Sequence, residues 1–108
     1  MQSKILKKMQ RSIVTNFLDT IILAELKKSG PLSGYDLMDS VHRKFDFLIS
    51  PGTVYSLLYS MERKGLVKGV RAQTKRMYVL TDKGVETING ILMSKEEIQG
   101  FIRICISG

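Results

Sequence analysis

The sequence predicts a mainly α-helical domain with one small β-hairpin, an α+β fold, and three observations lead to this class. Apolar residues recur at the three- and four-residue spacing of a buried helix face in four stretches, residues 12–28, 35–41, 54–61 and 85–105. Two short β-prone runs lie between the last two stretches. The chain has 108 residues, of which 44% are hydrophobic and 25% charged, a composition that supports a single folded core.

The first helix is expected over residues 12–28 and has an unusually wide apolar face. Asp19 and Glu25 occupy the remaining part of its circumference. A helix that is apolar on more than one side of so small a domain is expected to pack against a partner chain as well as against its own core.

The second helix is expected to follow a stretch of turn-forming residues at 29–34. Ser33 and Asp36 have the spacing of a capping box with Asp in place of Glu, which predicts the start of this helix. Its short apolar face ends around Lys44.

The third helix carries start and stop signals at its two ends. Ser50 is a preferred N-cap, Pro51 suits the first helical position, and Gly65 predicts the stop. One face is apolar and should turn toward the core. The side chains left largely outside are Thr53, Tyr55, Ser56, Tyr59, Ser60 and Arg63.

Beyond Gly65 the pattern changes to two short strands, residues 66–71 and 76–80, joined by a polar link. They predict a hairpin with cations on its arms and tip. Thr81 and Asp82 then cap a last helix with a broken apolar stripe. A capping-box pattern at residues 94–97 could interrupt this helix.

The net charge of +7 is concentrated in two segments, residues 1–11 and 61–83. A basic excess in a small domain favours polyanionic partners, nucleic acid above all. The alternative for any such excess is a solvated basic surface, and its localisation favours nucleic acid.

Several classes of protein are disfavoured. The single Cys105 cannot form an intrachain disulfide, no Cys/His cluster has metal-ligand spacing, and a reducing, cytoplasmic setting fits. No apolar run is long enough to span a bilayer, although contact of the basic N-terminus with a membrane surface stays an alternative. With no recognisable nucleophile, acidic pair or phosphate-binding loop, we expect neither an enzyme nor a cofactor.

The order helix, helix, capped helix, hairpin, helix is that of a winged helix-turn-helix. In this fold the third helix enters the major groove of DNA and the hairpin wing lies along the backbone. Free N–H groups at the start of that helix suit a phosphate oxygen, and short hydroxyl side chains allow close approach to base edges. Only Glu62 departs from this pattern.

Four spaced blocks of the chain, residues 32–37, 50–58, 61–67 and 78–84, together resemble the PadR family of bacterial and archaeal transcriptional regulators. The resemblance covers roughly residues 12–85. It implies that Pro51, Gly52, Thr53 and Tyr55 lie at the DNA, with Tyr59 and Arg63 further along, and Lys75 and Arg76 in the wing. It also implies a homodimer in which the first and last helices of two chains pack together.

The chain departs from the larger PadR-like proteins in lacking their long C-terminal domain, as does the short subfamily. The resemblance therefore carries over neither the dimer geometry nor an effector pocket of the larger proteins. An effector site built from stacked indoles is not carried over, because the chain has no Trp.

We therefore expect three parts: a basic N-terminal extension (1–11), a winged-helix DNA-binding domain (12–81) and a C-terminal dimerisation helix (82–108). The expected DNA contacts are Tyr35, Ser50, Pro51, Gly52, Thr53, Tyr55, Ser56, Tyr59, Arg63, Lys64, Lys68, Arg71, Lys75 and Arg76. The expected dimer contacts are Ile13, Phe17, Leu18, Ile21, Ile88, Leu92, Ile98, Phe101, Ile102 and Cys105.

The expected function is sequence-specific regulation of transcription, by repression, as a homodimer on an inverted-repeat operator in double-stranded DNA. A small-molecule effector at the dimer interface would release it. The alternative is a winged-helix module that binds proteins, or DNA without sequence specificity.

Some side chains also have simpler interpretations. Tyr55 and Tyr59 could pack against the hairpin instead of binding phosphates, and His42 is better explained as a solvent-exposed residue than as a pH sensor. Cys105 is better explained as an apolar filler than as a redox switch. The Met residues fill gaps in the core or interface, or line an adaptable effector cavity.

Overall fold

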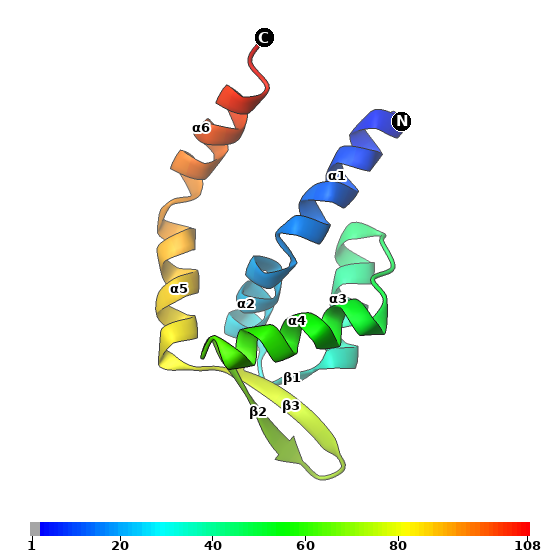
Figure 1. The fold of residues 1–108 in the computed structure, drawn as a ribbon, viewed down its shortest axis with the longest axis vertical. Helices are drawn as coiled ribbons and strands as arrows, with labels where there is room; N and C mark the ends of the chain where they lie inside the picture. Colours follow the sequence, from blue (N-terminus) through cyan, green and yellow to red (C-terminus); the bar gives the residue numbers. More distant parts are fainter. Residues whose placement is uncertain (1–2) are drawn as a thin grey trace.

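The computed structural model describes residues 3–108 as an elongated domain measuring 51 × 28 × 21 Å. Its elements, in chain order, are α1 (Lys4–Asn16), α2 (Leu18–Ser29), β1 (Leu32–Ser33), α3 (Gly34–Phe45), α4 (Pro51–Arg63), β2 (Val67–Ala72), β3 (Lys75–Leu80), α5 (Asp82–Met93) and α6 (Lys95–Cys105). In Figure 1 the β2–β3 hairpin projects from one end, and α1 and α6 extend toward the other, where both termini lie.

The single helix expected over residues 12–28 is wrong, because the chain bends at Phe17 and separates α1 from α2. Backbone hydrogen bonding nearly continues through the bend. The side-chain amide of Asn16, however, donates to the carbonyl oxygen of Ser12 at 2.9 Å, a local bond that competes with regular helix. The expected extension begins with residues 1–2, which lie outside the described residues. Its basic side chains, Lys4, Lys7, Lys8 and Arg11, all belong to α1.

The core lies where α2 is surrounded by α3, α4, α5 and the sheet. Its fully buried side chains include Ile22 from α2, Leu37 from α3, Leu58 from α4 and Ile88 from α5. Removing such side chains from water is the main stabilising contribution to a domain of this size. The four helices that position the hairpin are therefore held by one continuous core.

Local signals place most helix starts where the sequence predicts them. The N-cap side chains of Ser33, Ser50 and Thr81 each accept a backbone N–H bond at the start of α3, α4 and α5. Gly65 has φ 76°, a left-handed conformation that glycine adopts without strain, directly after α4.

The sheet has three antiparallel strands in the order β1-β3-β2. The hairpin turn is tighter than expected, with Ala72 paired to Lys75 and only two residues between them. β1 was not expected: Leu32 pairs with Tyr78 and Ser33 with Met77. The short turn-like stretch becomes a strand because β3 offers it a free edge.

The last helix is interrupted at Ser94, which separates α5 from α6. The capping-box pattern at this point is not realised, because Ser94 makes no side-chain capping bond. None of the residues of α6 is buried.

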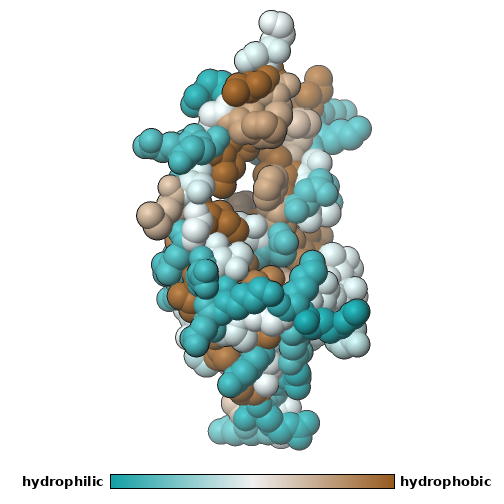
Figure 2. Space-filling view, turned by 60° about the vertical axis from the view of Figure 1, so that its left-hand side comes forward, coloured by the Kyte–Doolittle hydropathy of each residue, from teal (hydrophilic) through white to brown (hydrophobic). Residues whose placement is uncertain are grey.

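Apolar side chains are left uncovered on α1 and α6. Figure 2 shows them gathered over the end of the molecule to which these helices extend, whereas the wing end is hydrophilic. The exposed apolar residues there include Ile5, Leu6, Met9, Ile13, Phe17, Ile98, Phe101 and Ile102.

Two of the expected dimer contacts do not belong to this surface. Leu18 and Ile88 are 2% and 0% exposed within a single chain, because they pack in its own core. Ile21 is partly buried against the same core. Leu18 and Ile88 therefore stabilise the fold of one protomer and are not displayed to a partner, whereas Ile21 is only partly covered.

Candidate nucleic-acid interface

The start of α4 is built to leave backbone groups free at the surface. The Ser50 hydroxyl accepts the amide of Thr53 at 3.2 Å, and Pro51 occupies the first turn. Gly52 is exposed, and a Cβ added there would meet no described atom within 4 Å. Packing within the chain therefore does not require a glycine at this position, and the open space suits close approach by another molecule.

The outer face of α4 displays side chains at helical spacing. Tyr59 is 64% exposed, and the guanidinium of Arg63 lies over its ring, with Cζ 5.7 Å from the centroid. Ser56 is exposed one turn before Ser60. This face presents hydroxyl and cationic groups and carries no exposed carboxylate.

Tyr55 lies on the same helix but also packs within the chain. A Cβ placed at Gly34 would come within 2.5 Å of its ring, so the ring lies directly on the backbone at the start of α3. The side chain keeps 46% of its surface exposed. Tyr55 therefore packs on the first turn of α3, whereas the expected packing partner was the hairpin.

A hollow beside this tyrosine is lined by four elements. The lining residues are Ser33 of β1, Tyr35 of α3, Tyr55 of α4, and Lys75, Arg76 and Tyr78 of β3. Tyr35 is 69% exposed at its rim. The hollow combines phenol rings with cationic groups, a combination that suits a nucleic-acid backbone.

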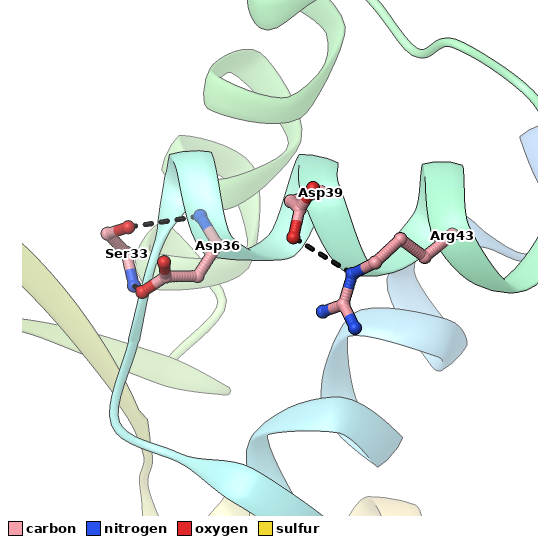
Figure 3. Close-up of polar contacts among 4 residues, drawn as sticks. All are labelled: Ser33, Asp36, Asp39 and Arg43. Carbon is pink, nitrogen blue, oxygen red and sulfur yellow. Dashed lines mark hydrogen bonds and ion pairs between the residues drawn. The ribbon is translucent and has the colours of Figure 1, made fainter.

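The capping box of α3 holds one wall of this hollow in place (Figure 3). The Asp36 amide donates to the Ser33 hydroxyl at 3.1 Å, and the Asp36 carboxylate accepts the Ser33 amide at 3.0 Å. The bond from the Ser33 amide lowers the pKa of Asp36. One and two turns further along, Asp39 and Arg43 form an exposed ion pair at 2.9 Å.

The wing carries its cations in two different states. Lys68, Arg71 and Lys75 are exposed. Arg76 instead donates from Nη2 to the Glu62 carboxylate at 2.6 Å, with its Cζ 5.7 Å from the ring centroid of Tyr78. Tyr78 and Glu62 raise the pKa of Arg76 above its ordinary value.

Glu62 departs from the pattern of the outer face, and its partners could not be predicted from the sequence. The role of Lys83 was not predicted either: its Nζ donates to the carbonyl oxygen of Lys64 at 2.8 Å and so caps the end of α4. The position of Lys83 just inside the following helix gave no signal of this contact. Both roles depend on how the hairpin folds back.

The remaining candidates stay apart from this surface. His42 is exposed on α3, and Cys105 is exposed at the end of α6. Within residues 3–108, no cluster of His, Cys, Asp and Glu side chains has the geometry of a metal site. No helix in the same range combines the length and apolar character needed to cross a membrane.

A helix-turn-helix formed by α3 and α4, followed by a β2–β3 wing, defines the class of winged-helix proteins. Residues 22–89 match the model of the transcriptional regulator PadR-like family, and the chain belongs to this family. Its members regulate transcription, so the protein is a transcriptional regulator and not an enzyme.

Solved structures agree with this assignment. A PadR-like transcriptional regulator from Bacillus cereus is 24% identical with a TM-score of 0.73, and the match covers 90% of this chain and 98% of that one. Bacillus subtilis PadR, solved in complex with operator DNA, is 26% identical with a TM-score of 0.59 over 69% of this chain and 46% of that one. The expected winged-helix fold is confirmed.

A curated relative is the transcriptional activator GvpE2 of Halobacterium salinarum. It is 24% identical over 83 residues, which are 75% of this chain. The chain spans 43% of the length of that relative.

Proposed function

We propose that the protein binds double-stranded DNA and regulates transcription sequence-specifically, with α4 in the major groove and the β2–β3 wing along the backbone. The observation that carries the proposal is the outer face of α4. Gly52, Tyr59 and Arg63 form an uncovered polar and cationic surface there, beside the exposed cations of the wing. Bacillus subtilis PadR, to which the chain is similar, was solved in complex with operator DNA, which supports DNA as the ligand.

In this proposal the base contacts come from α4, and the phosphate contacts come mainly from the wing. Side chains of α4 reach base edges, whereas Lys68, Arg71 and Lys75 neutralise phosphates. The hydroxyls of Tyr35 and Tyr55 bind the backbone near the hollow between α3 and the wing. Losing a base contact changes specificity, and losing a phosphate contact weakens binding to all DNA alike.

The active species in this proposal is a homodimer joined through the apolar faces of α1 and α6. Ile13 and Phe17 on the first helix and Ile98, Phe101 and Ile102 on the last are all at least 38% exposed. Covering them with a second chain removes apolar surface from water. Two α4 helices about 34 Å apart would then read an inverted repeat.

The division into a winged-helix domain (12–81) and a dimerisation segment (82–108) belongs to the same proposal, with α1 contributing to the dimer. We propose repression by occupancy of the operator, in the cytoplasm where the chromosome lies. An effector held between the apolar faces of α1 and α6, which include the exposed Met9, would change the spacing of the two α4 helices and release the DNA.

The deciding experiment is a selection from random double-stranded DNA at near-physiological salt, with the mass of the protein in solution measured in parallel. Recovery of one palindromic motif by a dimer supports the proposal. Recovery of unenriched DNA, with binding that only weakens as salt rises, would identify a module without sequence specificity. A reporter gene behind the selected motif then separates repression from activation.

A further inference from the structure

A single carboxylate ties the α4 helix to both strands of the wing. Glu62 accepts the backbone amide of Gly69 in β2 at 3.2 Å and the guanidinium of Arg76 in β3 at 2.6 Å, through the same oxygen, Oε2. We call Glu62, Gly69 and Arg76 the wing latch. It is a polar connection between the groove-facing helix and the hairpin.

Gly69 is needed in the latch because of what lies against it. A Cβ added at this position would come within 2.4 Å of the Arg76 guanidinium. Gly69 pairs with Tyr78 in the register, and the guanidinium lies over the Tyr78 ring. Because Gly69 has no side chain, the Arg76 guanidinium can lie against it and reach Glu62.

The base of the wing is fixed by the core, in which Val67 and Tyr78 are buried, and the outer half of the wing is held less firmly. β1 pairs only with Tyr78 and Met77 of β3, so the outer half of the hairpin has no third strand. β2 is an edge strand, and among the described residues its Gly69 amide is satisfied by Glu62. A two-stranded ribbon is marginally stable by itself, so a contact that anchors it at mid-length contributes to its angle.

The latch also neutralises one of the positive charges of the wing. Arg71 and Arg76 are directly opposite each other in the register, and like charges at such a pair repel. The Glu62 carboxylate neutralises Arg76 and leaves Arg71 as the free cation of the pair. Arg76 therefore differs from the other wing cations in facing an internal partner.

We propose that Glu62 and Arg76 are positioning residues, which set the angle of the wing against α4 and so contribute to the choice of DNA sequence. Arg76 is then not one of the phosphate contacts, contrary to what the resemblance implies. The DNA-related half of this proposal rests on the proposed function, whereas the existence of the latch does not.

The latch is suited to a clean test because it contributes little to global stability. The side chains of Arg76 and Glu62 are 56% and 32% exposed, and ion pairs at such exposure are weak. Breaking the contact should loosen the wing without unfolding the domain. Gly69→Ala displaces the flexible end of Arg76 with no change in charge, and Glu62→Gln removes the carboxylate.

Arg76→Gln removes the guanidinium itself. Arg71→Gln is its matched control, because it deletes one cation from the directly opposite position and leaves the latch intact. A melting curve for each variant shows whether the fold is retained.

The first measurement uses the free protein. Amide relaxation and hydrogen exchange by NMR should show residues 68–77 more mobile in Glu62→Gln and Gly69→Ala than in the wild type, with the Gly69 amide less protected. Arg71→Gln should leave them unchanged. Unchanged wing amides in both latch variants would overturn the proposal, whether or not the protein binds DNA.

The second measurement compares affinity for the selected duplex with affinity for a scrambled duplex of equal length. Latch variants should lower the ratio of the two by about five- to tenfold, the lower range for coupling between sites. Arg71→Gln should weaken both alike and reduce the salt slope by about one. If Arg76→Gln did the same as Arg71→Gln, Arg76 would be a phosphate contact and the proposal wrong.

The mobility and affinity measurements together distinguish a failure of the latch from a failure of the proposed function. If the wild-type protein shows no preference for any duplex, the proposed function is wrong. The mobility of the wing then still decides whether the latch exists. If the wild-type protein prefers the selected duplex and the affinity ratio is unchanged in Glu62→Gln and Gly69→Ala, the latch does not contribute to specificity. The proposed function then still stands.

Discussion

Lys44 Nζ lies 2.6 Å from Glu25 Oε1, and this ion pair joins the last turn of α3 to the middle of α2. Glu25 is 8% exposed, so its carboxylate is nearly buried at the back of the helix-turn-helix. A nearly buried carboxylate depends on its partner, because without one its desolvation is uncompensated. The pair therefore links stability to pH.

The first prediction concerns this dependence. The hydrogen bond from Lys44 lowers the pKa of Glu25 from its usual 4.5. A lowered pKa in the folded state stabilises the protein above pH 4.5, and that contribution is lost as the pH falls through the folded-state value. Glu25→Gln should cost on the order of 1 kcal/mol near neutral pH.

Denaturant unfolding of wild type and Glu25→Gln from pH 3 to 7 checks this. The difference between the two should be constant at the upper end and shrink below about pH 4.5. Using the difference cancels the acid sensitivity that Asp36 adds to both proteins. A difference that did not change with pH would show that the carboxylate contributes nothing as an ion.

A second prediction uses two glycines of α5. A Cβ at Gly84 would come within 2.1 Å of the Leu66 carbonyl oxygen, whereas Gly90 has no described atom within 4 Å of that position. Gly84→Ala should destabilise by about 1–3 kcal/mol, because backbone cannot move aside easily. Gly90→Ala should instead stabilise by about 0.5–1 kcal/mol through its better helix propensity.

Thermal or urea unfolding of the two variants measures both values. The pair controls for the chemistry of the substitution, since both changes occur in one helix. Equal effects of the two substitutions would mean that α5 does not start against the strand end at Leu66.

The third prediction separates stability from DNA binding at Gly52. The position is helical and open, so Gly52→Ala should leave the melting temperature unchanged or raise it. The added methyl group lies where we propose that the duplex approaches, and binding should fall by tenfold or more, about 1.4 kcal/mol. Fluorescence anisotropy with the selected duplex gives the affinity, with Gly90→Ala as the unaffected control. Full affinity in Gly52→Ala would mean that the start of α4 stands away from the DNA.

Features of the fold that depend on neighbouring residues could be predicted from the sequence. Ser33, Ser50 and Thr81 cap their helices as expected, because a cap is a bond within three residues of the chain. The bend at Phe17 could not be predicted, since neither glycine nor proline marks it and apolar spacing continues through it. β1 could not be predicted either, because two residues form a strand only when another strand lies beside them.

In the candidate site, too, local features could be predicted and contacts between distant residues could not. Periodicity predicts which side chains of α4 face outward, and Tyr59 and Arg63 are exposed as expected. The contact of Tyr55 with Gly34 and the capture of Arg76 by Glu62 depend on how α3 and the hairpin lie against α4. The members of these two pairs are 21 and 14 positions apart along the sequence, and spacing alone cannot pair them. Spacing alone also does not show that Leu18 and Ile88 are buried in the core of their own chain. That is why neither the contact of Arg76 with Glu62 nor the burial of Leu18 and Ile88 was predicted.

The last prediction concerns the apolar face of α6. Phe101 is 66% exposed and shares a helix face with Ile98, Ile102 and Cys105, which all point away from the core of their own chain. Phe101→Glu should place a charge inside the proposed dimer and shift the protein to monomer. Gln99→Glu adds the same charge off that face and should leave the dimer intact. Sedimentation velocity gives the masses, and the melting temperature of each variant shows that the winged-helix core survives, since α6 contributes no buried residue to it.

Because a monomer holds only one α4 helix against the DNA, Phe101→Glu should also lose most of its affinity for an inverted repeat while keeping its affinity for a half-site. A dimer that persisted in Phe101→Glu would assign the interface to the exposed side chains of α1 instead.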